Sequence, residues 1–159
     1  MTYSWVRKRQ RKRMPYENPE GRRVNALAAL LRRAGETDLV WTTKPKAFVA
    51  EEVVQFLRDL PPAPVPTIVV LDNAGIHRSK VVQAALPELW ARRVYLYYLP
   101  PYSPELNAIE PVFRVIKHHE LPERRSTTVP ALIAAIDTGF TSYRARLHAK
   151  SQTQPGRAA

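Results

Sequence analysis

Two short apolar runs, TIVVLD (67–72) and RVYLYYL (93–99), most constrain the fold of this chain. Both are rich in β-branched or aromatic residues and are too short to be buried helices, so each predicts a β-strand. Residues 78–91 between them have helical character, and Pro87 is expected to kink or break that helix. A strand, a helix and a second strand in this order predict parallel pairing in an α/β fold, in which ligands collect at the carboxyl ends of the strands.

Apolar residues at helical spacing predict three further helices. These lie over residues 47–60, from Asn107 through Ile116, and from Val129 to Leu147. The stretch RRVNALAALLRR (22–33) is ambiguous. Its intrinsic propensity favours a helix, but a strand paired with DLVWTT (38–43) across the AGET turn also fits the sequence.

The composition is that of one compact domain, because 159 residues with 45% apolar content can bury a sizeable core. The absence of cysteine excludes disulfides and thiolate metal sites. The N-terminal sequence MTYSWVRKRQRKRM lacks the apolar region of a signal peptide, and no run approaches the length of a membrane span. We therefore expect a cytoplasmic protein without a membrane segment, with one domain over residues 1–148 and a disordered tail over residues 149–159.

Positive charge is concentrated near the N-terminus. Residues 1–33 contain ten Lys or Arg and two Glu, and so carry +8 of the net charge of +11. Such a basic arm suggests a polyanionic partner, most simply nucleic acid, although a solvated basic tail is the alternative. The side chains expected to contact phosphates are Arg7, Lys8, Arg9, Arg11, Lys12, Arg13, Arg22 and Arg23.

The run LDNAGIH (71–77) places a carboxylate at the predicted carboxyl end of a buried strand. An Asx cap for the following helix would account for Asp72 and Asn73, and a hydrogen bond at the start of that helix would account for His77. Asp72 is also placed where a metal ligand of an α/β protein would lie. Local sequence alone leaves both interpretations open.

A second carboxylate, Glu110, follows the Pro-rich stretch LPPYSPELNAIE (99–110). Asn107 is the expected N-cap of the next helix, which would make Glu110 a capping-box residue. Considered with Asp72, Glu110 suggests a site for a hard divalent cation, since Mg²⁺ prefers oxygen ligands and takes one or two protein carboxylates. Two such ions would suit in-line phosphoryl transfer on nucleic acid.

The motifs VVLDNAGIH and LYYLPPYSPELNAIE, followed by FRVIK, resemble the catalytic domain of mariner-like insertion-sequence transposases, which are DDE superfamily endonucleases. The resemblance implies that Asp72 and Glu110 are the second and third catalytic carboxylates and ligand Mg²⁺ or Mn²⁺, with Asn73, His77 and Asn107 in supporting roles. It implies an RNase H-like fold, a mixed sheet flanked by helices. It also implies that the ambiguous segment (22–33) is a strand.

The chain departs from the family pattern in one important respect. The family's first carboxylate lies in a first strand upstream of the segment matching YSWVRKRQRKR, and residues 1–16 contain no Asp or Glu. Asp38 and Asp59 lack the context of that strand. We therefore expect a sheet truncated at its first strand, in the C-terminal part of a transposase. Milder departures are Ala108, where the family usually has Pro, and Phe113, where it usually has Trp.

Three functional interpretations follow. The chain is the catalytic portion of a transposase that acts on transposon ends and target DNA once an upstream polypeptide, or self-association, completes it. Alternatively, it is an inactive remnant. The third interpretation is a non-catalytic module that binds nucleic acid or joins transposase assemblies as an inhibitor.

Overall fold

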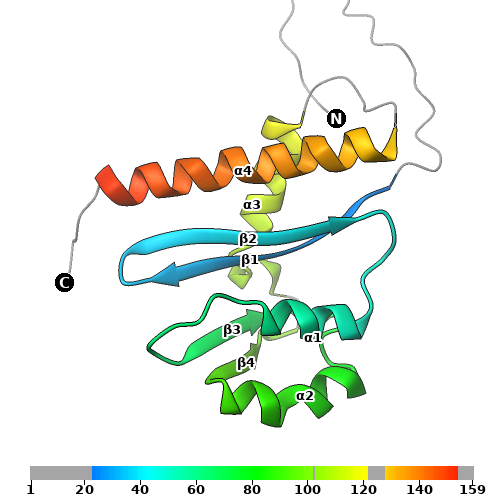
Figure 1. The fold of residues 1–159 in the computed structure, drawn as a ribbon, viewed down its shortest axis with the longest axis vertical. Helices are drawn as coiled ribbons and strands as arrows, with labels where there is room; N and C mark the ends of the chain where they lie inside the picture. The colour runs from blue at the N-terminus through cyan, green and yellow to red at the C-terminus, as the bar shows by residue number, and fades with distance from the viewer. Residues whose placement is uncertain (1–22, 102, 122–127, 154–159) are drawn as a thin grey trace, which may run out of the picture.

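A computed structural model describes residues 23–101, 103–121 and 128–153 (Figure 1). The basic arm up to Arg22 lies outside these residues, while Arg23 is exposed just before the first strand. In chain order the elements are β1 (Asn25–Arg33), β2 (Glu36–Lys44), α1 (Ala50–Arg58), β3 (Thr67–Leu71), α2 (Lys80–Ala91), β4 (Val94–Tyr98), a 3₁₀ turn η1 (Pro104–Leu106), α3 (Glu110–Val115), a π-helical turn η2 (Ile116–Glu120) and α4 (Val129–Thr153).

Strands β1 and β2 form an antiparallel hairpin, so the ambiguous N-terminal segment is a strand, as the family resemblance implied. Arg33 pairs with Glu36, which leaves a two-residue loop of Ala34 and Gly35. Both loop residues have positive φ, 44° and 86°, as a type I′ hairpin turn requires. Gly35 takes this conformation at no steric cost, while Ala34 is held there by the pairing on either side.

Alternate residues of β1 pack on opposite sides of the hairpin. Ala26, Ala28 and Leu30 contact the cluster built around Phe140. Leu27, Ala29 and Leu31 contact the cluster built around α1 and α2. The strand is therefore apolar at nearly every position because both of its faces are covered, which is also why its sequence resembles that of a helix.

Strands β3 and β4 pair in parallel, with Leu71 opposite Tyr98, and α2 forms the crossover between them, as predicted. A kink or a break was predicted at Pro87, and the break does not occur, because α2 continues through Pro87 as one element. Helices α1 and α2 pack together and bury Val53, Leu57, Val82, Leu89 and Val94. The opposite face of these strands leaves large apolar side chains exposed: Ile68, Val70, Tyr95 and Tyr97.

The predicted α/β class with helices flanking the strands is confirmed, and the arrangement is consistent with an RNase H-like fold. The described strands form two sheets of two strands each. Within the described residues β1 pairs with β2 alone, and β3 pairs with β4 alone. Figure 1 shows β1 and β3 running in opposite directions. One cavity is lined by residues 26–29 of β1 and residues 69–71 of β3, so neighbouring strands of the two sheets face each other across it.

Helix α4 covers the outer face of the β1–β2 hairpin (Figure 1). Phe140 stacks on Trp41, with ring centroids 5.2 Å apart, and meets Phe113 of α3 edge-on at 6.1 Å. A Cβ on Gly139 would come within 3.0 Å of Glu120, so glycine lets α4 approach the η2 turn closely. Residues 149–153 continue α4 as helix instead of beginning the expected tail. No helix in the described part of the chain is long and apolar enough to cross a membrane.

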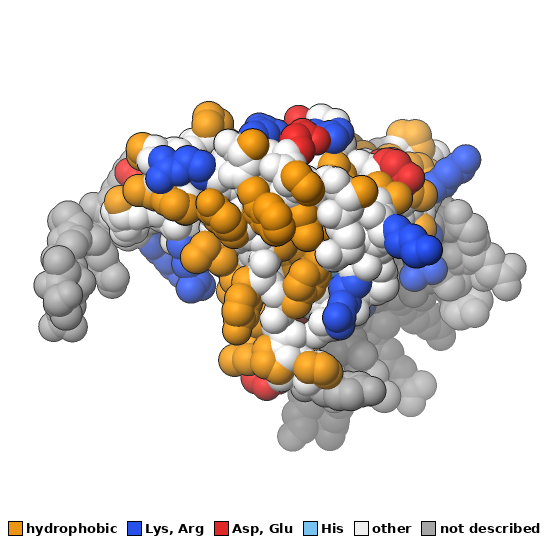
Figure 2. All heavy atoms as spheres, turned by 90° about the horizontal axis from the view of Figure 1, so that it is seen from below, with side chains coloured by type: hydrophobic (Ala, Val, Ile, Leu, Met, Phe, Trp, Pro, Cys, Tyr) orange, Lys and Arg blue, Asp and Glu red, His pale blue; other side chains and the backbone are white. Residues whose placement is uncertain are grey.

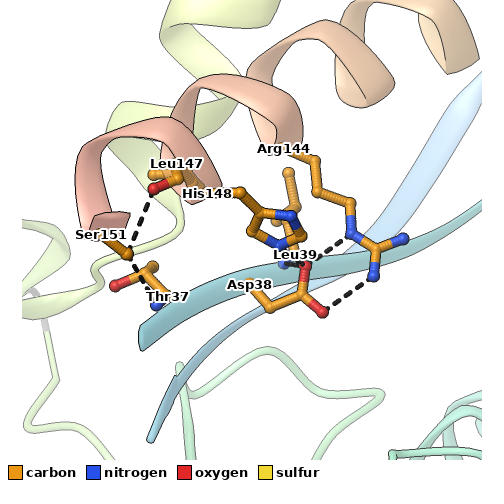
Figure 3. A network of polar contacts seen from close by, with 7 residues as sticks. All are labelled: Thr37, Asp38, Leu39, Arg144, Leu147, His148 and Ser151. Carbon is orange, nitrogen blue, oxygen red and sulfur yellow. Dashed lines mark hydrogen bonds and ion pairs between the residues drawn. The ribbon is translucent and has the colours of Figure 1, made fainter. Parts of the chain in front are cut away.

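A polar network ties the hairpin to the end of α4 (Figure 3). The Arg144 guanidinium donates to both Asp38 oxygens, at 2.5 and 2.9 Å, and His148 Nε2 lies 2.8 Å from Asp38 Oδ1. Chiefly through the Arg144 hydrogen bonds, and against partial burial, the pKa of Asp38 falls from its usual 3.8 to about 2. The same contact raises the pKa of Arg144.

Substituting Asp38→Asn tests this network, because it removes the charge while leaving an acceptor for the Leu39 amide. We expect the free energy of unfolding at pH 7 to fall by about 1–2 kcal/mol, the lower end reflecting solvent screening of a part-exposed pair. A lowered carboxyl pKa stabilises the fold above the usual pKa of 3.8, and this contribution is lost as the pH falls through about 2. The deficit of the variant, measured by urea unfolding, should therefore shrink over that range.

The matched control is Glu88→Gln, which removes a carboxylate from an exposed pair with Arg58. We expect little change in its unfolding at any pH, because exposed pairs contribute little. Equal stability of the two variants at pH 7 would contradict a stabilising role for Asp38.

Candidate functional site

The loop after β3 fixes the orientation of Asp72. The Ala74 amide donates to Asp72 Oδ1 at 3.0 Å, and His77 Nδ1 lies 2.8 Å from the same oxygen. Asp72 does not cap α2, since the N-cap is Ser79, whose hydroxyl accepts from the Val82 amide. The capping interpretation of Asp72 is therefore wrong, although its local Asx turn is present.

His77 is held by the strand beside it. Its side chain is 16% exposed, and its backbone carbonyl accepts a 2.8 Å hydrogen bond from the Tyr98 hydroxyl at the end of β4. An ionised carboxylate only accepts, so the tautomer of His77 that suits this contact has its proton on Nδ1. The second oxygen, Oδ2, makes no hydrogen bond or ion pair within the described part of the chain.

Asn73 links the ends of the two parallel strands. Its Nδ2 donates to the carbonyl oxygen of Leu99, the residue after β4, and its Oδ1 accepts from Arg78 at 3.2 Å. The Arg78 guanidinium also lies over the Tyr98 ring, 5.8 Å from its centroid. Asn73 therefore supports the site by holding the loop that carries Asp72 against the next strand.

Glu110 is the first residue of α3, and its carboxylate is exposed. Asn107 is not the N-cap as predicted; it ends the 3₁₀ turn η1, and the cap position falls to Ile109. The Glu110 amide donates to the Asn107 carbonyl oxygen at 3.1 Å, which joins the turn to the helix. Pro111 follows in the first helical turn, where its missing N–H leaves no bond unmade.

Asp72 and Glu110 line the same two cavities. One, of about 280 Å³, is open to the loops and is also lined by Asn73 and Asn107. The other, of about 230 Å³, runs between the two sheets and is also lined by His77 and Asn107. Each is several times the ~30 Å³ share of one liquid water, so a hydrated cation fits. The residues that local sequence patterns singled out therefore lie around one place, at the carboxyl edge of β3 and β4.

Tyr98 and Arg78 were not foreseen as parts of this site. In the sequence, Tyr98 is one of several aromatic residues of a predicted strand. Its role depends on its hydrogen bond to the carbonyl oxygen of His77, 21 positions away in the chain. Within the described ranges no three His, Asp or Glu side chains gather as a metal-binding group. The site as described offers two carboxylates.

A protein-family model for a DDE superfamily endonuclease matches residues 1–133 of the chain. A search among curated proteins gives no match.

The link made by Asn73 can be tested by substitution to alanine. This change leaves the Leu99 carbonyl without its side-chain donor, and we expect a loss of about 1–2 kcal/mol in the free energy of unfolding, measured in urea. Gln55→Ala is the control, because its amide makes an exposed bond to Asp59 on the surface of α1. Equal stability of the two variants would show that the link contributes nothing.

Proposed function

Because the chain belongs to the DDE superfamily endonucleases, we propose that it is the C-terminal catalytic portion of a mariner-like insertion-sequence transposase, which cuts and joins DNA. The observation that supports this proposal is that Asp72 and Glu110 line the same cavities at the carboxyl edge of the β3–β4 sheet. In this proposal the two carboxylates are ligands of a catalytic divalent cation.

The donors present suit Mg²⁺ or Mn²⁺. Asp72 offers Oδ2 as a single, oriented ligand, and Glu110 offers an exposed carboxylate from the start of a helix. Oxygen ligands of this kind, with substrate phosphate completing the shell, are those Mg²⁺ prefers. When bound, the ions would stabilise the charge that develops on the attacking and leaving oxygens.

The chain's own residues would prepare the site before any ion arrives. His77 and the Ala74 amide hold Asp72 Oδ1, so the carboxylate cannot turn away from the cavity. Asn73 and Tyr98 hold the same loop to β4. Preorganised ligands do not have to be ordered during binding, which favours the correct metal geometry.

In this proposal a third carboxylate reaches the site on an additional strand, which lies in the cavity between the two sheets. β1 and β3 each present one unpaired edge to the space between them within the described chain. A strand placed there would run antiparallel to β1 and parallel to β3 (Figure 1). Its carboxyl end would lie at the same edge as the end of β3 at Leu71, which Asp72 follows. We propose that this strand is supplied by an upstream polypeptide, or through self-association, and carries the third acid.

DNA is the proposed partner, including transposon ends and target. Arg7, Lys8, Arg9, Arg11, Lys12, Arg13 and Arg22 lie outside the described residues, and their phosphate-binding role stays a prediction. Exposed Arg23 leads from that arm into β1, whose first residues line the inter-sheet cavity. The arm would therefore begin near the acidic pair.

Metal binding can be tested without catalysis. Titrating Mn²⁺ into ¹⁵N-labelled protein should broaden the amide signals of Ala74, Asn107 and Glu110 most strongly. Asp72→Asn or Glu110→Gln should weaken this broadening at least about tenfold in Mn²⁺ concentration, since removing groups that build a metal site typically costs 10–100-fold in affinity.

Asp59→Asn is the matched control for this titration. Asp59 is a carboxylate that lines a different cavity, beside Phe48 and Lys44, and its loss should leave the broadening unchanged. Broadening that survives both site variants, or that centres on Asp59, would refute the shared metal site.

Cleavage tests the third carboxylate. We expect residues 1–159 alone neither to nick nor to join DNA, because charge neutralisation at the scissile phosphate is incomplete. Adding the first-strand segment, fused or as a separate polypeptide, should produce Mg²⁺-dependent cleavage at cognate ends, and Asp72→Ala or Glu110→Ala should abolish it. Cleavage by the chain alone would contradict the need for a third acid. No cleavage with the segment present would favour an inactive remnant or an assembly inhibitor.

A further inference from the structure

Strand β4 leaves one of its two edges open, since it pairs with β3 alone among the described strands. On the β3 side, the Arg93 carbonyl oxygen accepts a hydrogen bond from the Thr67 amide at 2.8 Å. The Leu99 amide likewise donates to the Leu71 carbonyl oxygen at 2.8 Å. Consecutive residues of a strand direct their backbone groups to opposite sides, so the odd-numbered residues face β3 and the even-numbered residues face the open edge.

The backbone groups at the open edge of β4 belong to Val94, Leu96 and Tyr98. Within the described residues, their amides and carbonyl oxygens make no hydrogen bond on that side. A row of free donors and acceptors of this kind is a template on which another strand can pair.

The sequence of β4 does not protect this edge. Proteins commonly block edge strands with charged side chains, with Pro or with a bulge. The strand reads Val-Tyr-Leu-Tyr-Tyr, without charge or Pro, and it is rich in residues that favour strands. In contrast β2, which pairs with β1 alone among the described strands, contains Glu36, Asp38 and Lys44. The fold therefore has charged residues on one outer strand and none on the other.

The outer face of the β3–β4 sheet is apolar beside the open edge. Tyr95 and Tyr97 are 44% and 59% exposed, and their neighbours on β3, Ile68 and Val70, are 68% and 49% exposed. The other face of the same strands packs against α1 and α2. An exposed apolar face that reaches an open edge indicates a surface for association.

We propose that a second copy of the chain pairs with this edge, β4 against β4, about a twofold axis at Leu96. A twofold interface uses the same patch on both copies, so a strand that pairs with itself in one sheet runs antiparallel. The two sheets then form one sheet of four strands, in the order β3–β4–β4–β3, with a continuous apolar outer face. The inference does not rest on the proposed function, because it requires neither a metal ion nor DNA.

The direction of the backbone groups fits this register. In an antiparallel pair, opposite residues alternate between pairs that exchange two hydrogen bonds and pairs that exchange none. With the axis at Leu96, that residue bonds to its own copy, and Val94 bonds to Tyr98 of the second copy. These are the residues whose backbone groups face the open edge.

The side chains fit the same register. Tyr95 lies opposite Tyr97 of the second copy, and this pair occurs twice because of the symmetry. Both are at positions that exchange no hydrogen bonds, where side chains of opposite strands come closest. Aromatic pairs at such positions stabilise a sheet, and no like charges face each other anywhere along the strand.

This interface leaves the candidate site open. Asp72 follows the carboxyl end of β3, so antiparallel pairing places the two copies of Asp72 at opposite ends of the joined sheet. The edges of β1 and β3 at the inter-sheet cavity are not used either. Pairing through β4 and insertion of a further strand between β1 and β3 are therefore separate events.

The first test compares two double variants that remove the same tyrosines. Tyr95→Lys/Tyr97→Lys places lysine opposite lysine across the axis, whereas Tyr95→Lys/Tyr97→Glu places lysine opposite glutamate. Sedimentation velocity over a dilution series in metal-free buffer should show a reversible dimer of the unsubstituted chain. The dimer Kd of the first variant should exceed that of the second at least about tenfold, because like charges directly opposite each other destabilise a strand pair.

Both substituted positions are exposed, so neither double variant should lose its fold, and urea unfolding checks this. An unsubstituted chain that stays monomeric at every concentration would overturn the inference. Equal dimer Kd values for the two double variants would overturn it too.

Disulfide cross-linking tests the register independently. The chain has no cysteine, so Tyr95→Cys and Tyr97→Cys each carry a single thiol. Across the proposed interface the Cα atoms of positions 95 and 97 are about 4.5 Å apart, within the range of a disulfide, while two copies of the same position are about 7–8 Å apart, beyond it. Under mild oxidation a mixture of the two variants should form a cross-linked dimer, and neither variant alone should. Equal cross-linking in all three samples, or none in any, would refute the pairing.

Discussion

The β1–β2 hairpin is covered by other elements on both faces, and the rest of the structure depends on this. One face contacts the cluster of α1, α2 and the β3–β4 sheet, and the other contacts α3 and α4. Asp72 follows β3, whose Val69 packs in the first cluster, and Glu110 begins α3, whose Val112 belongs to the second. The cavities that these two residues share therefore exist because one apolar hairpin packs against two hydrophobic clusters. The Asp38–Arg144 ion pair and the Trp41–Phe140 stack hold the second cluster to the hairpin.

The elements that depend on the local pattern of apolar residues could be predicted from the sequence. TIVVLD and RVYLYYL carry too few residues for helices and are separated by one helical stretch, so parallel pairing and the edge position of Asp72 followed from the sequence alone. The segment 22–33 was not decided by its residues, because a strand covered on both sides loses the alternation that marks strands. Its assignment came from the family resemblance.

Other features depend on contacts that no local pattern encodes. Asn107 has the right chemistry for an N-cap, but α3 begins later, after Ile109, which packs against the Phe140 cluster. The partners Asp38 and Arg144 are 106 positions apart, and the support of His77 by Tyr98 spans 21. The continuation of α4 past residue 149 is likewise accompanied by a hydrogen bond from the Thr37 amide to Ser151, 114 positions away. Tertiary packing overrode local preference at each of these points.

The surfaces that the described residues leave uncovered support the same proposal as the site, namely that a further strand joins this fold. Among the described strands, β1 and β3 each leave one edge unpaired beside one cavity, and the outer face of β3 and β4 exposes Ile68 and Tyr97 at 68% and 59%. Figure 2, viewed from below, shows apolar side chains spread over the surface of this end of the molecule. Unpaired edges and apolar faces invite association. Under the proposed function, a strand inserted between β1 and β3 would pair with both edges that the described residues leave open and would lie beside Asp72, so one event would stabilise the sheet and bring a further carboxylate to the site. Folding stability and catalytic competence would then be coupled, because the strand that completes the core would also carry the acid.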